Sequence, residues 1–300
     1  MMKRRKFFWY SLLFITGCSA TVNNNSNPSE EISSQDSGED KLKFTVTYIH
    51  QPEALEELYG EFASTLAEII DMPVELVLVG NHTEAASALQ LAELDLVLAG
   101  PSEYVIIGSN TNAIPIAAIA RPNNRSVIAV GVNSQIQSIA QLKGKTIAMS
   151  SVGSTTGHVG PLKLLLEAGI NPQRDLEMLW LGSEGSREAI AKKEVDAWAG
   201  STFDYEKLTL NQQPSQQKFK LLAEGELLPD DVFIASSQLD PEIVEILRHE
   251  MLAKQEKLIT AIAQTQENKK YASSQLTPVQ DSDYDSIRQI YKAIGEDKFL

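Results

Sequence analysis

The order of apolar segments constrains the fold of this chain more than any other feature of its sequence. Runs rich in β-forming residues at 43–49, 74–79 and 94–99 alternate with helical patterns at 52–70 and 83–91. Strands joined through helices at this spacing form a parallel sheet with crossover helices. The first third of the chain therefore predicts an α/β unit.

The same order of segments starts again further along the chain. Strands are predicted at 127–132, 146–149, 176–181 and 195–199, and helices at 138–142, 157–168 and 186–193. The segments LAELDLVLAG and IAKKEVDAWAG share one pattern of helix end, turn, Asp, strand and Gly. Two such units predict an α/β protein with two lobes.

A strand at 232–236 follows the second unit, and the chain from Pro241 onward is predicted to be mainly helical. We expect strands 127–132 and 232–236 to be the paired crossovers that form a hinge between the lobes. Lobe 1 is then 41–128 plus 236–300, and lobe 2 is 129–235.

The N-terminus has the pattern of an export and processing signal. Four basic residues, Lys3 to Lys6, precede an apolar run at 7–15, which is too short to span a membrane. Ile15-Thr16-Gly17-Cys18 follows and looks like the lipobox of a bacterial lipoprotein. The alternative is an ordinary signal peptide with a chance Cys, but the single Cys of the chain stands where the motif needs it.

This pattern predicts a signal peptide at 1–17 and a lipidated Cys18 at the start of a disordered polar tether that ends at residue 40. The expected location is the periplasm or cell surface, where the lipid on Cys18 anchors the protein to the membrane.

Composition excludes several classes of protein. The chain has 300 residues, 43% hydrophobic and 22% charged, which is typical of a soluble globular protein. A single Cys allows no intramolecular disulfide. The formal net charge of −14 argues against nucleic acid as a partner.

The segment after strand 146–149 predicts an anion site. Ser154, Thr155 and Thr156 stand between Gly153 and Gly157 and enter a helix. A helix N-terminus offers unpaired N–H groups and partial positive charge, so the hydroxyls add to an existing preference for anions. Plain N-capping is the alternative for one hydroxyl, and three in a row favour anion binding. The segment lacks the spacing and Lys of a nucleotide-binding loop.

A second loop is expected to face this segment. Gly100-Pro101-Ser102-Glu103-Tyr104 follows strand 94–99 at its carboxyl end, where open α/β sheets bind ligands. Ser102 and Tyr104 would donate hydroxyls across the cleft. The alternative is a Pro turn with Tyr104 packed in the core. Tyr48, near the end of the first strand, is a further candidate.

Three segments together resemble a known family: LDLVLAGPSEY, GSTTGHVGPLKLLLEAGINP and REAIAKKEVDAWAGSTFDYEKL. They are similar to the periplasmic binding proteins for phosphonate, phosphite or phosphate that serve ABC importers, in order and spacing over roughly 43–300. The resemblance implies a two-lobed, type II periplasmic-binding-protein fold that closes on its ligand. It also implies a permease and an ATPase as partners, and no cofactor.

The resemblance assigns roles to individual residues. Tyr104 matches the ligand-contacting Tyr of the family, and Ser154 to Thr156 match its phosphoryl cradle. His82 falls where phosphonate binders usually carry Tyr, and Ser183-Glu184 where they often carry His and an acid. Glu184 would accept a hydrogen from a protonated ligand oxygen.

Thr202, with Asp204 two residues later, falls where a further family acid is expected. These departures leave the anion open and favour a small one. Lobe 1 would close over the anion and bring Tyr104 and His82 to it.

Other functions are kept as alternatives. Catalysis has little support because the four His residues make no metal-type spacing and the chain has no Gly-x-Ser-x-Gly elbow, which leaves only a conceivable pair of Ser154 and His158. A ligand-presenting sensor of the same fold is one alternative. A binder of another small solute, such as an amino acid or a sulfonate, is the second, with Arg121, Arg125 or Arg187 as its charged partner.

Overall fold

A computed structural model describes residues 41–49, 51–210 and 217–297, and these belong to one compact unit that the contacts delimit as 39–300. The predicted signal peptide, Cys18 and the tether lie outside the described residues. No helix in the described ranges combines the length and apolar character needed to cross a bilayer.

The first sheet has six strands in the order β11-β4-β10-β3-β1-β2. Its strands are β1 (Leu42–Val46), β2 (Val74–Leu76), β3 (Leu96–Ala99), β4 (Ile114–Ile119), β10 (Asp231–Ala235) and β11 (Leu276–Thr277). β1 pairs in parallel with β2 and β3, as the sequence predicts, whereas β10 pairs antiparallel to β3 and β4. The sheet is therefore mixed.

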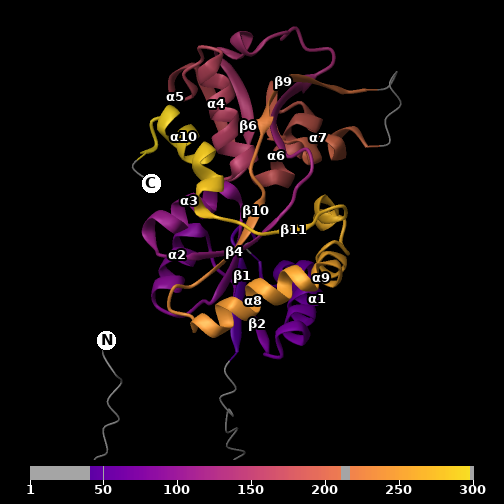
Figure 1. Cartoon of the computed structure of the whole chain (residues 1–300). Coiled ribbons are helices and arrows are strands. Elements are labelled where there is room, and N and C mark those ends of the chain that lie inside the picture. Colours follow the sequence, from indigo (N-terminus) through magenta and orange to yellow (C-terminus); the bar gives the residue numbers. More distant parts are fainter. Residues whose placement is uncertain (1–40, 50, 211–216, 298–300) are drawn as a thin grey trace, which may run out of the picture. The chain divides into compact units, whose positions relative to one another are not determined.

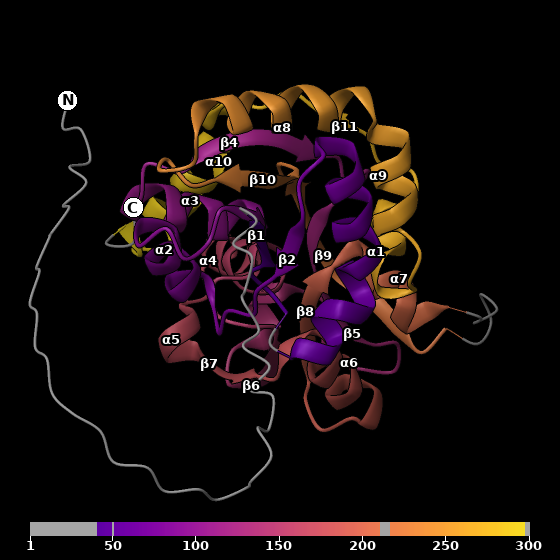
Figure 2. The ribbon, with the colours of Figure 1, turned by 90° about the horizontal axis from the view of Figure 1, so that it is seen from below.

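Helices cover both faces of the first sheet. They are α1 (Pro52–Ile70), α2 (His82–Gln90), α3 (Pro101–Asn110), α8 (Pro241–Ala253), α9 (Gln255–Ile262) and α10 (Asp285–Ala293). One core joins α1, α8 and α9 to residues such as Phe44 and Phe233, and Figures 1 and 2 both show these three helices together. A second core on the opposite face joins α2, α3 and α10 to residues such as Val97 and Val232. The predicted helix from Pro52 to Ile70 is confirmed.

The second sheet has five strands in the order β7-β6-β8-β5-β9. Its strands are β5 (Arg125–Gly131), β6 (Lys145–Met149), β7 (Leu176–Trp180), β8 (Ala197–Ser201) and β9 (Phe219–Leu227). The helical segments around it are a 3₁₀ turn (Ile139–Leu142), a π-type turn (Thr155–Val159), α4 (Gly160–Glu167), α5 (Pro172–Asp175), α6 (Gly182–Lys192) and α7 (Thr202–Thr209). Gly169 follows α4 with φ of 78°, as expected of a glycine that ends a helix.

The chain passes between the sheets twice. Residues 120–124 join β4 to β5, and residues 228–230 join β9 to β10. β5 and β10, which the sequence predicts as crossovers, each pair within one sheet, so the passages themselves are these short connections. The exact lobe boundaries stay a prediction.

Regular elements absent from the sequence prediction include α3, β4, α7 and β9. Pro101 opens α3 at its first position, where a missing N–H costs nothing, although Gly100-Pro101 reads locally as a turn. β4 and β9 both pair antiparallel to a neighbour and so stand outside the strand-helix-strand order that predicted the other strands.

Close packing of α4 on β5 makes Gly160 the most sensitive glycine of this contact. A Cβ at Gly160 would lie 1.9 Å from Ser126 Oγ and 2.8 Å from Ser126 Cβ. We predict that Gly160→Ala lowers the free energy of unfolding by about 1–3 kcal/mol, because overpacking forces backbone shifts. Urea denaturation measures this change.

Two further variants test the cause. Adding Ser126→Gly to Gly160→Ala should restore part of the loss, because it removes both clashing atoms. Gly108→Ala in α3 is the matched control: its Cβ would meet Tyr104 at 3.8 Å, an ordinary contact, so stability should hold or rise by up to about 1 kcal/mol. Equal losses for Gly160→Ala and Gly108→Ala would contradict the packing argument.

Candidate functional site

The predicted anion segment forms a tight loop that leads into a helix. Ser154 caps the helix: its Oγ accepts from Gly157 N at 3.2 Å, and its carbonyl accepts from His158 N and Val159 N at 3.0 Å. Helical structure then runs without a break from Thr155 through α4 to Glu167. The N-terminus of this segment is therefore both capped and positively polarised. We call residues 150–157 the anion cradle.

The cradle touches the N-terminus of α3 directly. Ser102 N donates to Thr155 Oγ1 at 3.0 Å, and the two hydroxyl oxygens lie 2.7 Å apart. Ser102 Oγ also donates to the Gly153 carbonyl. Two helix N-termini from different sheets thus meet at one place, as the predicted pairing of these two loops requires.

Glu103 is a residue of this contact that the sequence reasoning did not select. Its side chain is buried, and its Oε2 accepts from Gly100 N at 2.8 Å and from Thr47 Oγ1 at 2.7 Å. Burial raises the pKa of Glu103 above its usual value, while these two hydrogen bonds oppose the rise. The capping pattern of an acid three residues after Gly100 was the local signal for it.

His82 lies across the cradle from α3. It is the first residue of α2 and is half-buried, and its ring lies over Gly153. A Cβ at Gly153 would come within 2.7 Å of His82 Cε1, and Gly153 has φ of 90°. Both facts require glycine at this position. The structure therefore brings His82 to the predicted cradle.

His158, which the sequence analysis names only in a conceivable pair with Ser154, is buried. Its Nδ1 accepts from Gly153 N at 2.9 Å, and its ring meets Trp180 edge-on at 4.9 Å between centroids. Burial lowers the pKa of His158 to about 4. The imidazole is therefore neutral and holds the loop, because a protonated Nδ1 cannot accept. No Ser–His pair forms with this nitrogen.

The remaining predicted residues take varied positions. Thr156 is half-buried in the cradle, and Thr202 donates to the Asn123 carbonyl at 2.6 Å. Glu184 is exposed in the first turn of α6, whereas its neighbour Ser183 meets Ser150 of the cradle with 3.0 Å between hydroxyl oxygens. Ser183 is thus nearer to the cradle's hydrogen-bond network than the predicted Glu184.

Tyr104 does not bring its hydroxyl to the cradle. The side chain is buried and packs edge-on against Tyr284, with ring centroids 4.6 Å apart, and its hydroxyl donates to Asp281 at 2.7 Å. Burial and this carboxylate raise the pKa of Tyr104. Tyr104 therefore packs in the core, which was the alternative to ligand contact in the sequence analysis.

Tyr48 belongs to a separate buried polar cluster. Its hydroxyl meets those of Tyr59 and Tyr271, and Lys270 lies over its ring at 4.4 Å. Burial lowers the pKa of Lys270 to about 8. Tyr271 donates to Asp231 at 2.6 Å, which connects this cluster to the second passage between the sheets.

The carboxylate of Asp204, which follows the predicted acid position, is already engaged. Arg187 donates to its Oδ1, and Ser201 Oγ donates to its Oδ2 at 2.7 Å. Both side chains of the ion pair are less than one-fifth exposed. Arg187 is therefore a partner of Asp204 and not a free cation for a ligand.

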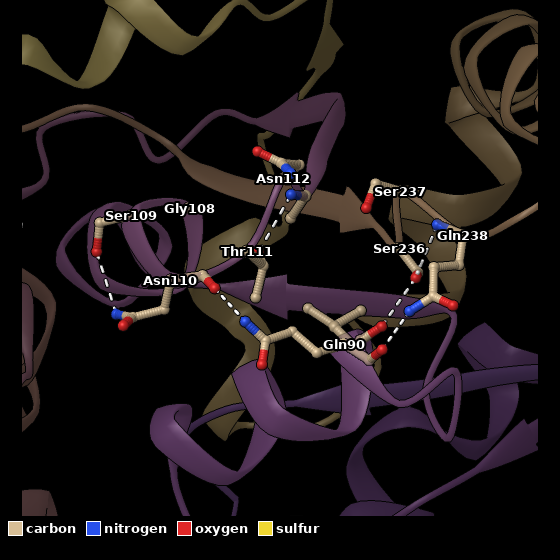
Figure 3. A pocket seen from close by; sticks show the side chains of 11 residues that line it. Gln90, Gly108, Ser109, Asn110, Thr111, Asn112, Ser236, Ser237 and Gln238 are labelled. Carbon is tan, nitrogen blue, oxygen red and sulfur yellow. Dashed lines mark hydrogen bonds between the residues drawn. The ribbon is translucent and has the colours of Figure 1, made fainter.

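A hollow of about 320 Å³ opens elsewhere, between the ends of α2, α3 and β10 (Figure 3). It is lined by hydroxyls and amides, with Gln90 donating to the Asn110 carbonyl and Gln238 to the Gln90 carbonyl. It contains no charged side chain. The cradle, in contrast, contains helix N-termini, which carry positive partial charge. No cluster of metal-ligating side chains occurs among the described residues.

One family model covers most of the chain. Residues 44–284 match the family described as "ABC transporter, phosphonate, periplasmic substrate-binding protein". The phosphate-import protein PhnD of Mycolicibacterium smegmatis is 24% identical over 280 residues, which cover 81% of this chain and 83% of that protein.

Two solved structures have the same fold. PhnD1 of Prochlorococcus marinus, in complex with methylphosphonate, has a TM-score of 0.71 at 20% identity and covers 85% of this chain and 98% of its own. A binding protein component of an ABC phosphonate transporter from Pseudomonas aeruginosa has a TM-score of 0.70 at 17% identity, with 87% of this chain and 88% of its own covered. Together they confirm the α/β fold class of periplasmic binding proteins.

The burial of His158 predicts a pH dependence of stability. Its pKa is about 4 in the folded chain against 6.5 for an ordinary His, so the neutral ring contributes stability that is complete above about pH 6.5 and lost as pH falls toward 4. We predict that the unfolding free energy of the native protein falls by about 3 kcal/mol relative to His158→Asn between pH 7 and pH 4.

Urea denaturation at several pH values measures this difference. The matched control is His249→Asn, since the His249 side chain is 78% exposed; its curve should stay parallel to that of the native protein. A parallel curve for His158→Asn as well would contradict the assignment of a neutral, buried ring.

Proposed function

This chain belongs to the family of periplasmic substrate-binding proteins of phosphonate ABC transporters, and from that premise we propose that its ligand is a small phosphorus oxyanion without an amine. Phosphite, phosphate and methylphosphonate fit this description. The chain is a binding protein, not an enzyme, and it works with the membrane components of an ABC transporter.

The meeting of Ser102 with Thr155 is the observation that carries the proposal. It places the N-termini of α3 and of the helical segment 155–167 against each other. Two positively polarised helix ends repel unless negative charge lies between them, so an anion bound there is stabilised by both. The Ser154 hydroxyl hydrogen and the first N–H groups of segment 155–167 are the donors that remain for ligand oxygens.

The state of Asp204 supports the absence of an amine. A ligand ammonium needs a carboxylate that has acceptor capacity and uncompensated charge. Asp204 holds Arg187 and Ser201, so its charge is already balanced. The amine of an aminoalkylphosphonate would therefore add little to its affinity, whereas small phosphorus anions have no amine that needs a partner.

Two of the relatives described above are consistent with a small anion. The Mycolicibacterium smegmatis relative is named for phosphate import, and the Prochlorococcus marinus structure holds methylphosphonate. Closure around the ligand follows from the contact itself. The hydrogen bonds between Ser102 and Thr155 form only when the two loops meet. A ligand that binds to both loops would therefore shift the population toward the conformation in which they are in contact.

Calorimetry of the purified full chain tests the ligand. We predict binding of phosphite, phosphate or methylphosphonate and at least tenfold weaker binding of aminoethylphosphonate. Thr155→Val should weaken binding of the favoured anion by about tenfold, because it removes the hydrogen bonds with Ser102 that hold the two helix N-termini together, and each such bond contributes about 0.5–1.5 kcal/mol.

Thr260→Val is the matched control, since its hydroxyl donates only to the Glu256 carbonyl of its own helix. No binding of any phosphorus anion by the native chain would overturn the proposal. Equal anion affinities of the Thr155→Val and Thr260→Val variants would indicate that the anion binds elsewhere than in the cradle.

We also propose that the mature protein is anchored by a lipid on Cys18, with the polar segment up to residue 40 as its tether. The basic residues, apolar run and single Cys of the N-terminus support this. Anchoring would keep the binding unit beside its permease on the periplasmic side.

Cell fractionation tests the anchor. Native protein should be found in the membrane fraction and become labelled by a fatty-acid analogue. Cys18→Ser should prevent labelling and remove the protein from the detergent-extracted lipoprotein pool. Labelling that persists in Cys18→Ser would contradict the assignment.

A further inference from the structure

A buried carboxylate stands at a place built for an anion. Glu103 is only 8% exposed, and it follows Ser102 directly at the N-terminus of α3. Negative charge beside a bound anion is repulsive unless a proton lies between the two. The position of Glu103 therefore restricts which anions the cradle accepts.

The carboxylate is held in one orientation. Gly100 N and Thr47 Oγ1 both donate to Oε2, at 2.8 Å and 2.7 Å. Within the described residues no hydrogen bond falls on Oε1. One oxygen is thus fixed by the protein, and the other keeps its acceptor capacity.

Glu103 and the cradle border the same small space. At Gly100 the position of a Cβ is 3.0 Å from Glu103 Oε2 and 3.5 Å from Thr155 Oγ1. Burial raises the pKa of Glu103, and His82 is among the groups that oppose the rise, so a third group lies near this space. Gly100 leaves the room that any larger residue would fill.

A second observation points to an occupant. The hydroxyl of Tyr291, a residue 1% exposed, lies beside Ser102 without a well-formed hydrogen bond. Burial raises the pKa of Tyr291 and the Ser102 side chain opposes the rise, so this hydroxyl faces the same group of residues. An unpaired buried hydroxyl costs free energy that a ligand oxygen would recover.

Resting on the proposed function, we propose that Glu103 accepts the proton of a protonated phosphorus oxyanion and so excludes sulfate and sulfonates. The ligand P–OH donates to Glu103, while its unprotonated oxygens receive the helix N–H groups and hydroxyls of the cradle. Phosphate keeps a P–OH near neutral pH, and phosphite and methylphosphonate each have a protonated form in equilibrium with the dianion. Sulfate and methanesulfonate have none, so their oxygens would face the carboxylate as acceptor against acceptor.

Matched ligand pairs test this in the native chain. Methylphosphonate and methanesulfonate have nearly the same shape, as do phosphate and sulfate. By calorimetry at neutral pH we expect each phosphorus anion to bind at least about 100-fold more tightly than its sulfur counterpart, because a site built for a ligand hydroxyl strongly rejects the analogue without it. A preference below about tenfold would overturn the proposal without any variant.

Glu103→Gln separates recognition from helix capping. The amide oxygen of the variant still accepts from Gly100 N and Thr47 Oγ1. The amide nitrogen replaces Oε1, so a hydrogen-bond donor takes the place of an acceptor. We expect the preference for the phosphorus member of each pair to fall below about tenfold, with a gain in sulfate or methanesulfonate binding.

The control is Glu57→Gln, which makes the same change of charge at an exposed position of α1 and should leave the preference unchanged. An unchanged preference in Glu103→Gln, with binding retained, would mean that Glu103 only caps α3. Loss of preference in both variants would assign the effect to net charge. Absence of all phosphorus-anion binding in the native chain would instead be a failure of the proposed function.

Discussion

The contact between Ser102 and Thr155 is the interaction on which the site depends. It joins the N-terminus of a helix on the first sheet to the N-terminus of a helical segment on the second. Each end presents N–H groups and partial positive charge, so the contact creates a place where negative charge is stabilised from two sides. Gly153 and Gly157 permit the approach, since a Cβ at either position would clash with His82 or Ser150.

The acidity of the chain as a whole does not prevent anion binding, although Glu103 at the cradle favours anions that carry a proton. Asp204 is held by Arg187 and Ser201, and one oxygen of Glu103 by Gly100 and Thr47. The attraction for the ligand then comes from neutral donors in fixed positions. Such donors act at short range, so a net charge of −14 spread over the whole chain has little influence on them.

The two passages between the sheets are tied to each other by a charged pair. Arg121 N donates to Asp230 at 2.9 Å, and the Arg121 guanidinium lies 3.4 Å from Asp231. Asp231 also accepts from Tyr271, which connects the pair to the cluster around Tyr48. Removing one partner of a buried ion pair lowers stability far more than removing one partner of an exposed pair. The pair therefore holds the two passages in a fixed position relative to each other.

Local sequence determined the elements and donors that depend on neighbouring residues: the parallel strands with their crossover helices, the helix from Pro52, and Ser154 as a capping hydroxyl ahead of free N–H groups. A backbone N–H at a helix start is unpaired whatever lies elsewhere in the chain. Packing between distant segments decides which group becomes the hydrogen-bond partner of that N–H. Only the tertiary structure paired Ser102 with Thr155, turned Tyr104 toward Asp281, buried Glu103 and His158, and added the antiparallel strands β4 and β9. Their local patterns fit a turn, a loop or a solvated position equally well, and burial against residues far along the chain selected one of these.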